Sequence, residues 1–524
     1  MNRRTVFVLL LTALAVAATP VSGSSAPASR ASTQTIPDLR VGLATPVSTL
    51  DAAHSQQAPY IASLGLEQLV QIGPTGQTMP WLALKVSHPS RNVYIYTLRK
   101  GVKFWDGTGL TATDVANALN YNRDPGAQTA YLFNSVKSIV ALDRYRVAFT
   151  LKRPDASFVW APAQYPGQIF EKTFSDAHKG TLGTPGVLTM GSGPWKIVSL
   201  DPTRGAELVA NDKYWGGKPQ IRRISFEFFA DETSLALAFR AGDIDVAPQI
   251  TNPQAFAATA NTKLLNAPSC RQGFFGMNTQ AAPWNDVHVR RAVAYALNRS
   301  DLVAATGGYA TPTYTFIPRP QLLAIASKSQ VNGLVKSLQK YQFDLTKAKQ
   351  EMARSKYPKG FTVPFPTAPS GNRVQLVQVI AAELKQIGIN LDVHVLTSAA
   401  WAAQVSGPAK SRPAFFSVSG CNSPDPGFYP GTYLGKKNLA AGSFNVADYA
   451  PNDVENLITA GVATSNPQKR FATYSTLLKR LAQDVPYVPL FLQNVSAAIA
   501  DNLTWSTFNA TWYNRVWALE IKAK

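Results

Sequence analysis

The sequence has little cysteine, little histidine and few acidic residues. Its 524 residues include 2 Cys and 5 His, which excludes a disulfide-rich scaffold and a four-thiolate zinc site and argues against a metal centre built from histidines. Asp and Glu total 31 against 51 Lys and Arg, so the formal net charge is +20. That balance invites a nucleic-acid or anionic-surface partner. However, the positive charge is dispersed, and no basic run is interleaved with aromatics as a single-strand binder requires. We therefore expect no nucleic-acid partner.

Catalytic motifs are also missing. The chain contains no G-x-S-x-G, no H-E-x-x-H and no Walker A loop. Gly107 to Ala112 fits the loose G-x-G-x-x-A dinucleotide pattern, but Asp106-Gly107 is better explained as a turn and Thr111 as a helix cap. We therefore expect no enzyme activity, no cofactor and no metal site.

The N-terminus indicates the compartment. Asn2-Arg3-Arg4 is followed by an apolar run from Val6 to Ala18, which is shorter than the roughly 20 residues that a membrane span needs. Small residues follow, and Val21-Ser22-Gly23 offers a cleavage site. The pattern predicts a signal peptide over residues 1–23 and a flexible Ser/Ala/Pro-rich leader over 24–35. No cysteine lies near the cleavage site for a lipid anchor, and no later run could span a bilayer, so we expect an exported protein.

Export bears on whether the two cysteines form a disulfide. In an oxidising compartment Cys270 and Cys421 could form one disulfide that closes a loop of about 150 residues, worth about 4 kcal/mol in the loop-entropy model. The alternative is two buried free thiols. The spacing alone does not decide between them.

The composition and the hydrophobic patterns of the sequence indicate a folded core built from both helices and strands. Hydrophobic residues make up 45% and aromatics 10%, and helical and alternating patterns follow one another along the whole chain. This predicts an α/β protein. The expected strands are 94–98, 146–151, 224–228 and 389–395, and the expected helices are a capped one after Thr111, 235–241 closed by Gly242, one after Asp286, 374–387, and one after Asn466-Pro467.

Several blocks occur together in a familiar order. They are Y-T-L-R-K-G-V-K-F-W-D-G at 96–107 with L-T-A-T-D-V at 110–115, G-S-G-P-W at 191–195, Y-W-G-G-K-P at 214–219, A-G-D-I-D at 241–245, the helix region 278–296, 384–389, and Asp425-Pro426. In this order, spread over residues 40 to 500, the blocks resemble the peptide/nickel-type extracellular solute-binding proteins. These are the periplasmic receptors of ABC importers for dipeptides, oligopeptides and related solutes.

The resemblance implies a two-lobed periplasmic-binding-protein (Venus-flytrap) fold with an extra subdomain inserted in lobe I. Ligand would bind between lobes that close on it. The implied boundaries are 36–65, 190–268 and 490–524 for lobe I, 66–189 for the inserted subdomain, and 269–489 for lobe II.

The resemblance also implies ligand-binding residues. In peptide-binding relatives an aspartate four positions before the D-P proline pairs with the α-amino group of the peptide; here that position is Asn422, whose neutral side chain can only hydrogen-bond. Asp425 could contact ligand or cap its Pro-rich loop. Ser419 stands where relatives often carry a pocket tryptophan, and Trp401 matches another pocket aromatic, with ordinary packing as its alternative.

Three more positions are implied on the segments that flank the cleft. Arg373 begins a helix where some relatives bind a ligand carboxylate, with a solvated surface arginine as the alternative. Arg271 and Phe274, on the segment that enters lobe II, are expected to face the cleft. Cys270 and Cys421 lie near positions that a disulfide joins in some oligopeptide binders, which favours their pairing.

The function implied is capture of a small solute and its delivery to the permease subunits of an ABC importer in the inner membrane, by a periplasmic monomer without cofactors. The ligand could be a peptide, an opine or modified amino acid, an oligosaccharide or a metal chelate. The neutral Asn422 tilts the choice away from free α-amines. The alternatives from other classes are a secreted hydrolase and a nucleic-acid or adhesion protein.

Overall fold

The computed structural model describes residues 34–73, 76–257, 261–369, 371–420 and 423–524. The predicted signal peptide and most of the predicted leader lie outside these residues. No helix in the described ranges is both long and apolar enough to cross a membrane. The fold is α/β, as the sequence predicts.

One nine-stranded sheet connects most of the molecule, in the order β16-β12-β17-β11-β1-β10-β9-β8, with β13 paired to β17. We call the part built on β1, β8–β11 and the ends of β12 and β17 that pair beside them lobe I. Its elements are β1 (Leu39–Leu43), α1 (Pro59–Ala62), β8 (Trp195–Asp201), β9 (Gly205–Ala210), β10 (Arg223–Phe228), α4 (Glu232–Ala241), β11 (Val246–Ile250), α5 (Gln254–Ala257), β18 (Leu503–Thr504) and β19 (Lys522–Ala523).

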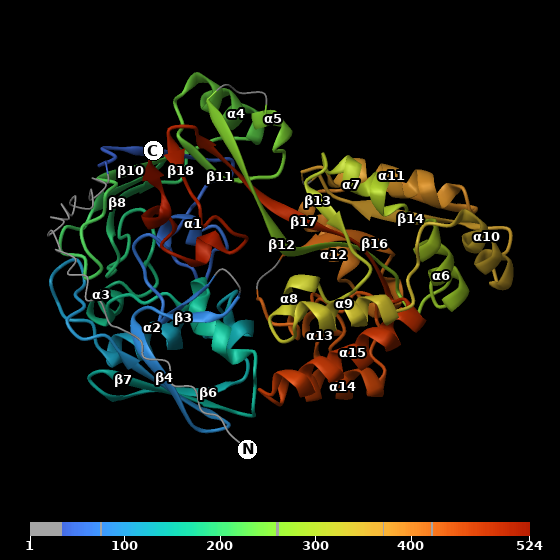
Figure 1. The fold of residues 1–524 in the computed structure, drawn as a ribbon, viewed down its shortest axis with the longest axis horizontal. Helices are drawn as coiled ribbons and strands as arrows, with labels where there is room; N and C mark the ends of the chain where they lie inside the picture. Colours follow the sequence, from blue (N-terminus) through green and yellow to red (C-terminus); the bar gives the residue numbers. More distant parts are fainter. Residues whose placement is uncertain (1–33, 74–75, 258–260, 370, 421–422) are drawn as a thin grey trace, which may run out of the picture. The chain divides into compact units, whose positions relative to one another are not determined.

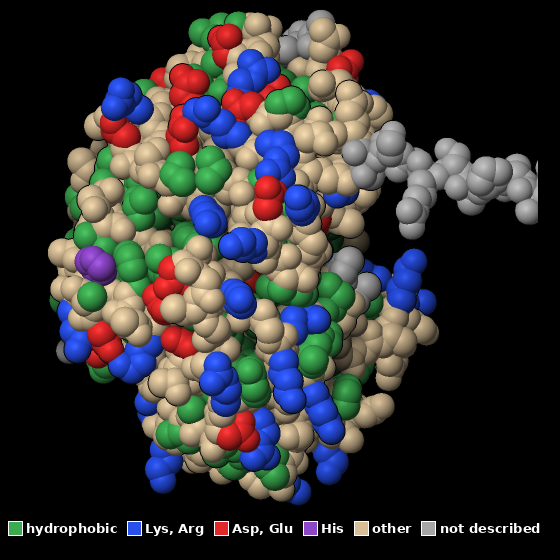
Figure 2. All heavy atoms as spheres, turned by 90° about the vertical axis from the view of Figure 1, so that its left-hand side faces the viewer, with side chains coloured by type: hydrophobic (Ala, Val, Ile, Leu, Met, Phe, Trp, Pro, Cys, Tyr) green, Lys and Arg blue, Asp and Glu red, His purple; other side chains and the backbone are tan. Residues whose placement is uncertain are grey.

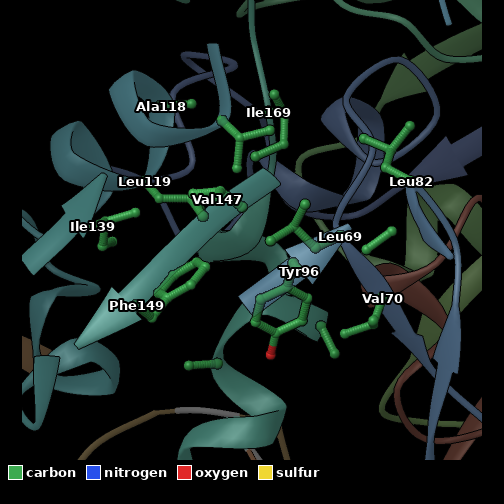
Figure 3. Close-up of a cluster of buried hydrophobic side chains, with 14 of the residues drawn as sticks. Leu69, Val70, Leu82, Tyr96, Ala118, Leu119, Ile139, Val147, Phe149 and Ile169 are labelled. Atoms are coloured by element: carbon green, nitrogen blue, oxygen red, sulfur yellow. The ribbon is translucent and has the colours of Figure 1, made fainter. Parts of the chain in front are cut away.

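A separate four-stranded sheet, β4-β5-β7-β6, forms an inserted subdomain. Tyr96, Val147 and Phe149 of this sheet belong to the same buried hydrophobic cluster as Ala118 and Leu119 of α2 (Figure 3). Helix α2 begins as predicted, because the Asp114 carboxylate accepts hydrogen bonds from Thr111 N and Oγ1. The elements are β2 (Val70–Ile72), β3 (Thr78–Pro80), β4 (Ala83–Ser90), β5 (Val93–Leu98), α2 (Ala112–Asn122), β6 (Val136–Asp143), β7 (Arg146–Leu151) and α3 (Lys172–Ala177).

Two long strands, β12 (Thr262–Gly276) and β17 (Tyr487–Ala500), run antiparallel beside each other through the middle of the sheet (Figure 1). Their register shifts between Ala267 and Arg271, so the pairing divides into a part beside β11 and a part beside β16. These two strands are the shared elements of lobe I and of the part that follows.

We call the part built on β13–β16 and α6–α15 lobe II. Two hydrophobic clusters fill it, one under α6 and α11 and one under α14 and α15. Its elements are α6 (Val287–Ala296), α7 (Arg299–Ala305), β13 (Ala310–Pro312), α8 (Arg319–Leu323), α9 (Lys328–Ser337), α10 (Leu345–Arg354), β14 (Phe361–Thr367), α11 (Arg373–Lys385), β15 (Ile389–Val395), α12 (Ser398–Val405), β16 (Phe415–Ser419), α13 (Phe428–Tyr433), α14 (Asn452–Val462) and α15 (Pro467–Asp484).

Candidate ligand-binding cleft

A cleft of about 700 Å³ lies between lobe I and lobe II. The parallel strands β1, β10 and β11 end on the lobe I side of it, at Leu43, Phe228 and Ile250. The carboxyl ends of parallel strands meet at one edge of a sheet, where open α/β folds bind ligands. The lining residues are Leu43, Ala44, Thr45, Tyr60, Asp231, Glu232, Thr233, Gln249, Thr251, Asn252 and Gln254 from lobe I, and Ala304, Ala305, Thr306, Gly307, Gly371, Asn372 and Gln375 from lobe II.

Both carboxylates in this lining are already engaged. Glu232 accepts hydrogen bonds from Thr251 N at 2.7 Å, from Thr251 Oγ1 at 2.8 Å and from Asn252 N at 2.8 Å. Asp231 caps α4 by accepting from Ser234 N at 2.8 Å. The groups left to meet a solute are mainly amides and hydroxyls.

The two lobes approach closely at two glycines. A Cβ on Gly307 would lie 2.9 Å from Gln254 Nε2, and a Cβ on Gly371 would lie 3.5 Å from Thr251 Oγ1. Both glycines have positive φ, 76° and 51°, which L side chains rarely adopt. A side chain at Gly307 would therefore be strained and would displace the Gln254 side chain at the edge of the cleft.

Arg373 and Trp401, which the sequence places on different helices, lie in contact. The guanidinium carbon of Arg373 sits 4.4 Å from the centroid of the Trp401 ring. Burial lowers the pKa of Arg373, and within the described ranges its guanidinium makes no hydrogen bond or ion pair. The Trp401 Nε1 is buried and also has no hydrogen-bond partner among the described residues. This pair thus presents unsatisfied donors beside Asn372, at the N-terminus of α11, where the helix dipole favours an anion.

Arg271 is a second arginine without a carboxylate partner in the described part of the chain. Its Nε is buried and makes no hydrogen bond to a residue that the structure describes. The positive charge acts on Tyr60, Tyr429 and Tyr513, although burial is the larger influence and raises the pKa of each of these phenols. Arg271 is not one of the residues that line the cleft, but its positive charge acts on Tyr60, which is.

Asp425 and Ser419 are engaged by other protein groups. Asp425 is fully buried, and Arg470 Nη2 donates to its two carboxylate oxygens at 2.7 and 2.6 Å. It also accepts from Gly427 N at 2.6 Å, which favours the structural alternative for this residue. The Ser419 hydroxyl is buried and hydrogen-bonded to the Tyr433 hydroxyl.

The expectation that Phe274 faces the cleft is wrong. Its side chain is fully buried in the lobe II core, with Tyr433, Tyr487 and Phe415 around its ring. Strand β12 has strands on both sides and packed side chains on both faces, so alternation along it does not expose Phe274.

The disulfide and one predicted ligand contact involve residues whose placement the structure does not describe. Cys270 is disulfide-bonded, while Cys421 lies outside the described residues, as does Asn422. The pairing of the two cysteines and the role of Asn422 therefore stay predictions.

Sequence reasoning missed the polar residues that follow the parallel strands, such as Thr45, Thr251 and Asn252. The available signal was their position directly after β1 and β11, two short apolar strands. It also missed Glu67, a fully buried glutamate in the apolar run 64–72. Burial raises the pKa of Glu67 to about 7, against hydrogen bonds from Ser192, Trp215, Tyr214 and Trp81.

A two-lobed α/β fold with a polar cleft at the strand ends defines a class of protein, the solute-binding proteins of ABC importers. The family described as "Bacterial extracellular solute-binding proteins, family 5 Middle" matches residues 77–440. The chain belongs to this family.

Similar curated proteins include the glutathione-binding protein GsiB of Escherichia coli (strain K12), which is 25% identical over 421 residues. GsiB of Salmonella typhimurium (strain LT2) is 26% identical over 426 residues. Each alignment covers 78% of this chain and 80% of the relative.

Solved structures with the same fold include DppA of Helicobacter pylori, in complex with the peptide STSA, at a TM-score of 0.75 and 22% identity, covering 94% of this chain and 98% of that one. AgaA of A. tumefaciens R10, in complex with agropinic acid, has a TM-score of 0.75 and 22% identity. The match covers 93% of this chain and 99% of AgaA. CtaP of Listeria monocytogenes has a TM-score of 0.79 at 19% identity, covering 94% and 100%. The two-lobed fold expected from the sequence is thus confirmed.

Proposed function

We propose that this solute-binding protein captures a small polar solute that carries a carboxylate, in the class of peptides and opines. The observation that carries the proposal is the guanidinium of Arg373, which has no carboxylate partner in the described part of the chain and stacks on Trp401 beside the cleft. A guanidinium without a carboxylate partner is suited to a carboxylate ligand, since the two groups form charge-assisted hydrogen bonds. Arg271 supplies a second positive charge, which acts on Tyr60 in the lining of the cleft.

The rest of the cleft supports the same class. Its amides, at Gln249, Asn252, Gln254, Asn372 and Gln375, can hydrogen-bond polar groups of either sign. Its two carboxylates are held by backbone and hydroxyl donors, so they offer little to an ammonium group. The names of the relatives agree: glutathione and agropinic acid are both carboxylate-bearing solutes.

We further propose that the chain is not an enzyme, that it acts as a monomer in the periplasm after its N-terminal segment is removed, and that its lobes have the boundaries given by the sequence. A hydrolase would need a nucleophile and a base in contact. The described residues that line the cleft include no histidine or cysteine. Mass spectrometry of the exported protein would locate the mature N-terminus, and an intact residue 2 would contradict the export proposal.

A ligand screen tests the binding proposal. The purified protein is heated with glutathione, di- and tripeptides, opines, neutral oligosaccharides and a nickel–histidine chelate. A ligand present at 100 times its Kd should add about 2.7 kcal/mol to the free energy of unfolding. We expect stabilisation by carboxylate-bearing solutes. Stabilisation by a neutral oligosaccharide alone would overturn the proposed class.

A further inference from the structure

The sheet β4-β5-β7-β6 has one face in the core and one face outside it. Tyr94, Tyr96 and Phe149 point to the core face. On the opposite face Thr97 pairs with Lys85 on β4 and with Arg146 on β7, so these three side chains stand side by side. Both Lys85 and Arg146 are exposed.

This sheet and the segments between its strands carry more positive than negative charge. Residues 83–153 contain eleven Lys and Arg against four Asp and no Glu, a net charge of 11 − 4 = +7. Thus 7 of the 20 net positive charges lie in 71 of the 524 residues. This segment of the chain therefore carries a larger share of the net positive charge than its length alone would give it.

The end of the sheet at the β6–β7 turn gathers cations around one aromatic ring. Lys100 Nζ and the Arg144 guanidinium carbon each lie 5.8 Å from the centroid of the Tyr145 ring. The backbone of Lys103 forms a β-bridge with Gly109, and a Cβ on Gly109 would lie 3.5 Å from Arg144 Nη2, so Lys103 lies in a backbone segment next to this cluster. Lys100, Lys103 and Arg144 are exposed and make no ion pair with a described carboxylate.

Aliphatic side chains stand beside these cations. Val140 and Leu142 on β6 are each 46% exposed, close to the turn that carries Arg144 and Tyr145. We call Lys85, Lys100, Lys103, Val140, Leu142, Arg144, Tyr145 and Arg146 the hairpin patch. Asp143, next to the same turn, is paired with Arg146 at 2.5 Å.

A space-filling view supports this distribution. On the lower part of the face shown in Figure 2, Lys and Arg side chains outnumber Asp and Glu, and hydrophobic side chains lie among them. Strands β4 and β7 lie in the corresponding lower part of Figure 1. A mixture of cations with exposed aliphatic and aromatic groups is the composition that binds the interface of an anionic bilayer.

We propose that the hairpin patch is a docking surface for anionic lipid headgroups, which holds the protein at the membrane where its permease sits. The inference goes beyond the solute bound in the cleft and does not depend on it. Cations attract the negative surface of the bilayer, while Leu142, Val140 and Tyr145 enter the interface between headgroups and acyl chains. An acidic protein surface would pair with the cations but would leave the exposed aliphatics of the hairpin without a role.

Vesicle binding by the full-length mature protein tests this surface. Sedimentation with phosphatidylcholine vesicles, with and without a one-third share of phosphatidylglycerol, gives the partition coefficient. We expect binding only with phosphatidylglycerol, weakening as salt is raised to about 0.15 M because exposed charges are screened. The triple variant Lys100→Gln, Lys103→Gln and Arg144→Gln should bind about 100-fold more weakly, since each cation at the surface contributes about a fivefold factor.

A matched control separates the patch from the total charge. Lys328→Gln, Lys336→Gln and Lys469→Gln remove three exposed cations from lobe II and leave the same net charge. We expect this control to bind vesicles like the native protein. Equal losses in the two triple variants, or no binding by the native protein, would overturn the proposal. So would a patch variant that keeps vesicle binding but loses solute uptake, which would indicate an acidic protein partner.

The same variants distinguish this proposal from the proposed function. Both triple variants should keep the melting temperature of the native protein and its stabilisation by solute, because the hairpin patch shares no residue with the cleft. A patch variant that loses solute binding as well as vesicle binding would point to misfolding and count against the patch. Loss of vesicle binding alone supports it.

Discussion

The guanidinium groups of the arginines inside lobe II are paired with carboxylates, whereas those of the arginines near the cleft are not paired with a described carboxylate. Arg470 is buried against Asp425, and Arg412 is buried against Asp448 at 2.8 Å. The remaining donors of Arg412 reach backbone carbonyls at 407, 439, 440 and 445. Arg271 and Arg373, by contrast, have buried or half-buried guanidinium groups without a carboxylate partner in the described residues.

This difference separates stability from binding. Desolvating a charge is costly unless it is paired, so saturated arginines are expected where the chain must hold together. An arginine whose N–H groups have no acceptor in the protein can donate hydrogen bonds to a ligand. We therefore expect substitutions at the two kinds of site to change different measurements: the free energy of unfolding inside lobe II, and ligand affinity at the cleft.

The largest effect is expected at the buried pair. Asp425→Ala should lower the free energy of unfolding by about 3–5 kcal/mol, because it leaves Arg470 charged and unpaired in the interior. Chemical denaturation measures this loss. As a control, Asp425→Leu combined with Arg470→Met removes both charges and should be much less destabilising. If Asp425→Ala instead left stability unchanged and abolished solute binding, Asp425 would belong to the ligand site.

A second test uses a buried glutamate in lobe II. Burial raises the pKa of Glu383 to about 8, from 4.5. The folded state therefore holds this proton more tightly than the unfolded state. The contribution of Glu383 to the free energy of unfolding is fully present below pH 4.5 and is lost as the pH rises through 8. Glu383→Gln keeps an acceptor for Asn298 N but cannot ionise. It should raise the free energy of unfolding above pH 8 by about 2–4 kcal/mol.

The control for this test is Glu227→Gln, on the exposed surface of β10. It should leave the pH profile of unfolding unchanged between pH 4.5 and 9. The account of Glu383 would be contradicted by parallel pH profiles for the native protein and Glu383→Gln.

The third prediction concerns the cleft. Arg373→Gln should weaken solute binding by about 1.5–3 kcal/mol, or roughly 10- to 100-fold, because a charge-assisted hydrogen bond is lost. The free energy of unfolding should barely change. Lys385→Gln, at the other end of the same helix and exposed, is the matched control and should bind solute normally in calorimetric titration. Equal affinities of the native protein and Arg373→Gln would remove Arg373 from the site.

The smallest effect is expected at a surface pair. Arg223 on β10 and Glu207 on β9 form a diagonal ion pair, and the side chains of both are exposed to solvent. Arg223→Gln should change the free energy of unfolding by less than about 1 kcal/mol, and any effect should vanish in high salt. A larger loss at this site would mean that exposure does not separate weak from strong ion pairs in this chain.

Local structure could be predicted where one segment carries its own signal. The apolar spacing at 374–387 and Gly388 predict the helix that the structure shows as α11, and the alternation that follows predicts β15. Helix α4 begins earlier than predicted, at Glu232, because Asp231 caps it by accepting from Ser234 N. The apolar pattern alone carries no information about that cap.

Contacts between distant segments could not be predicted from the residues. The stacking of Arg373 on Trp401 depends on how α11 and α12 pack, and the burial of Phe274 depends on the layers that cover β12. The resemblance to the family pointed to Arg373 and Trp401 separately. The saturation of Asp425 by Arg470, which joins residues from α15 and the loop before α13, was likewise invisible in the sequence.

The central claim is that Arg373 recognises a carboxylate. The most direct measurement is the ratio of Kd values for one ligand from the screen and for its carboxamide analogue, in the native protein and in Arg373→Gln. The account predicts that the native protein prefers the acid by about 10-fold or more and that the preference disappears in the variant. An acid-to-amide ratio that is the same in both proteins would contradict it.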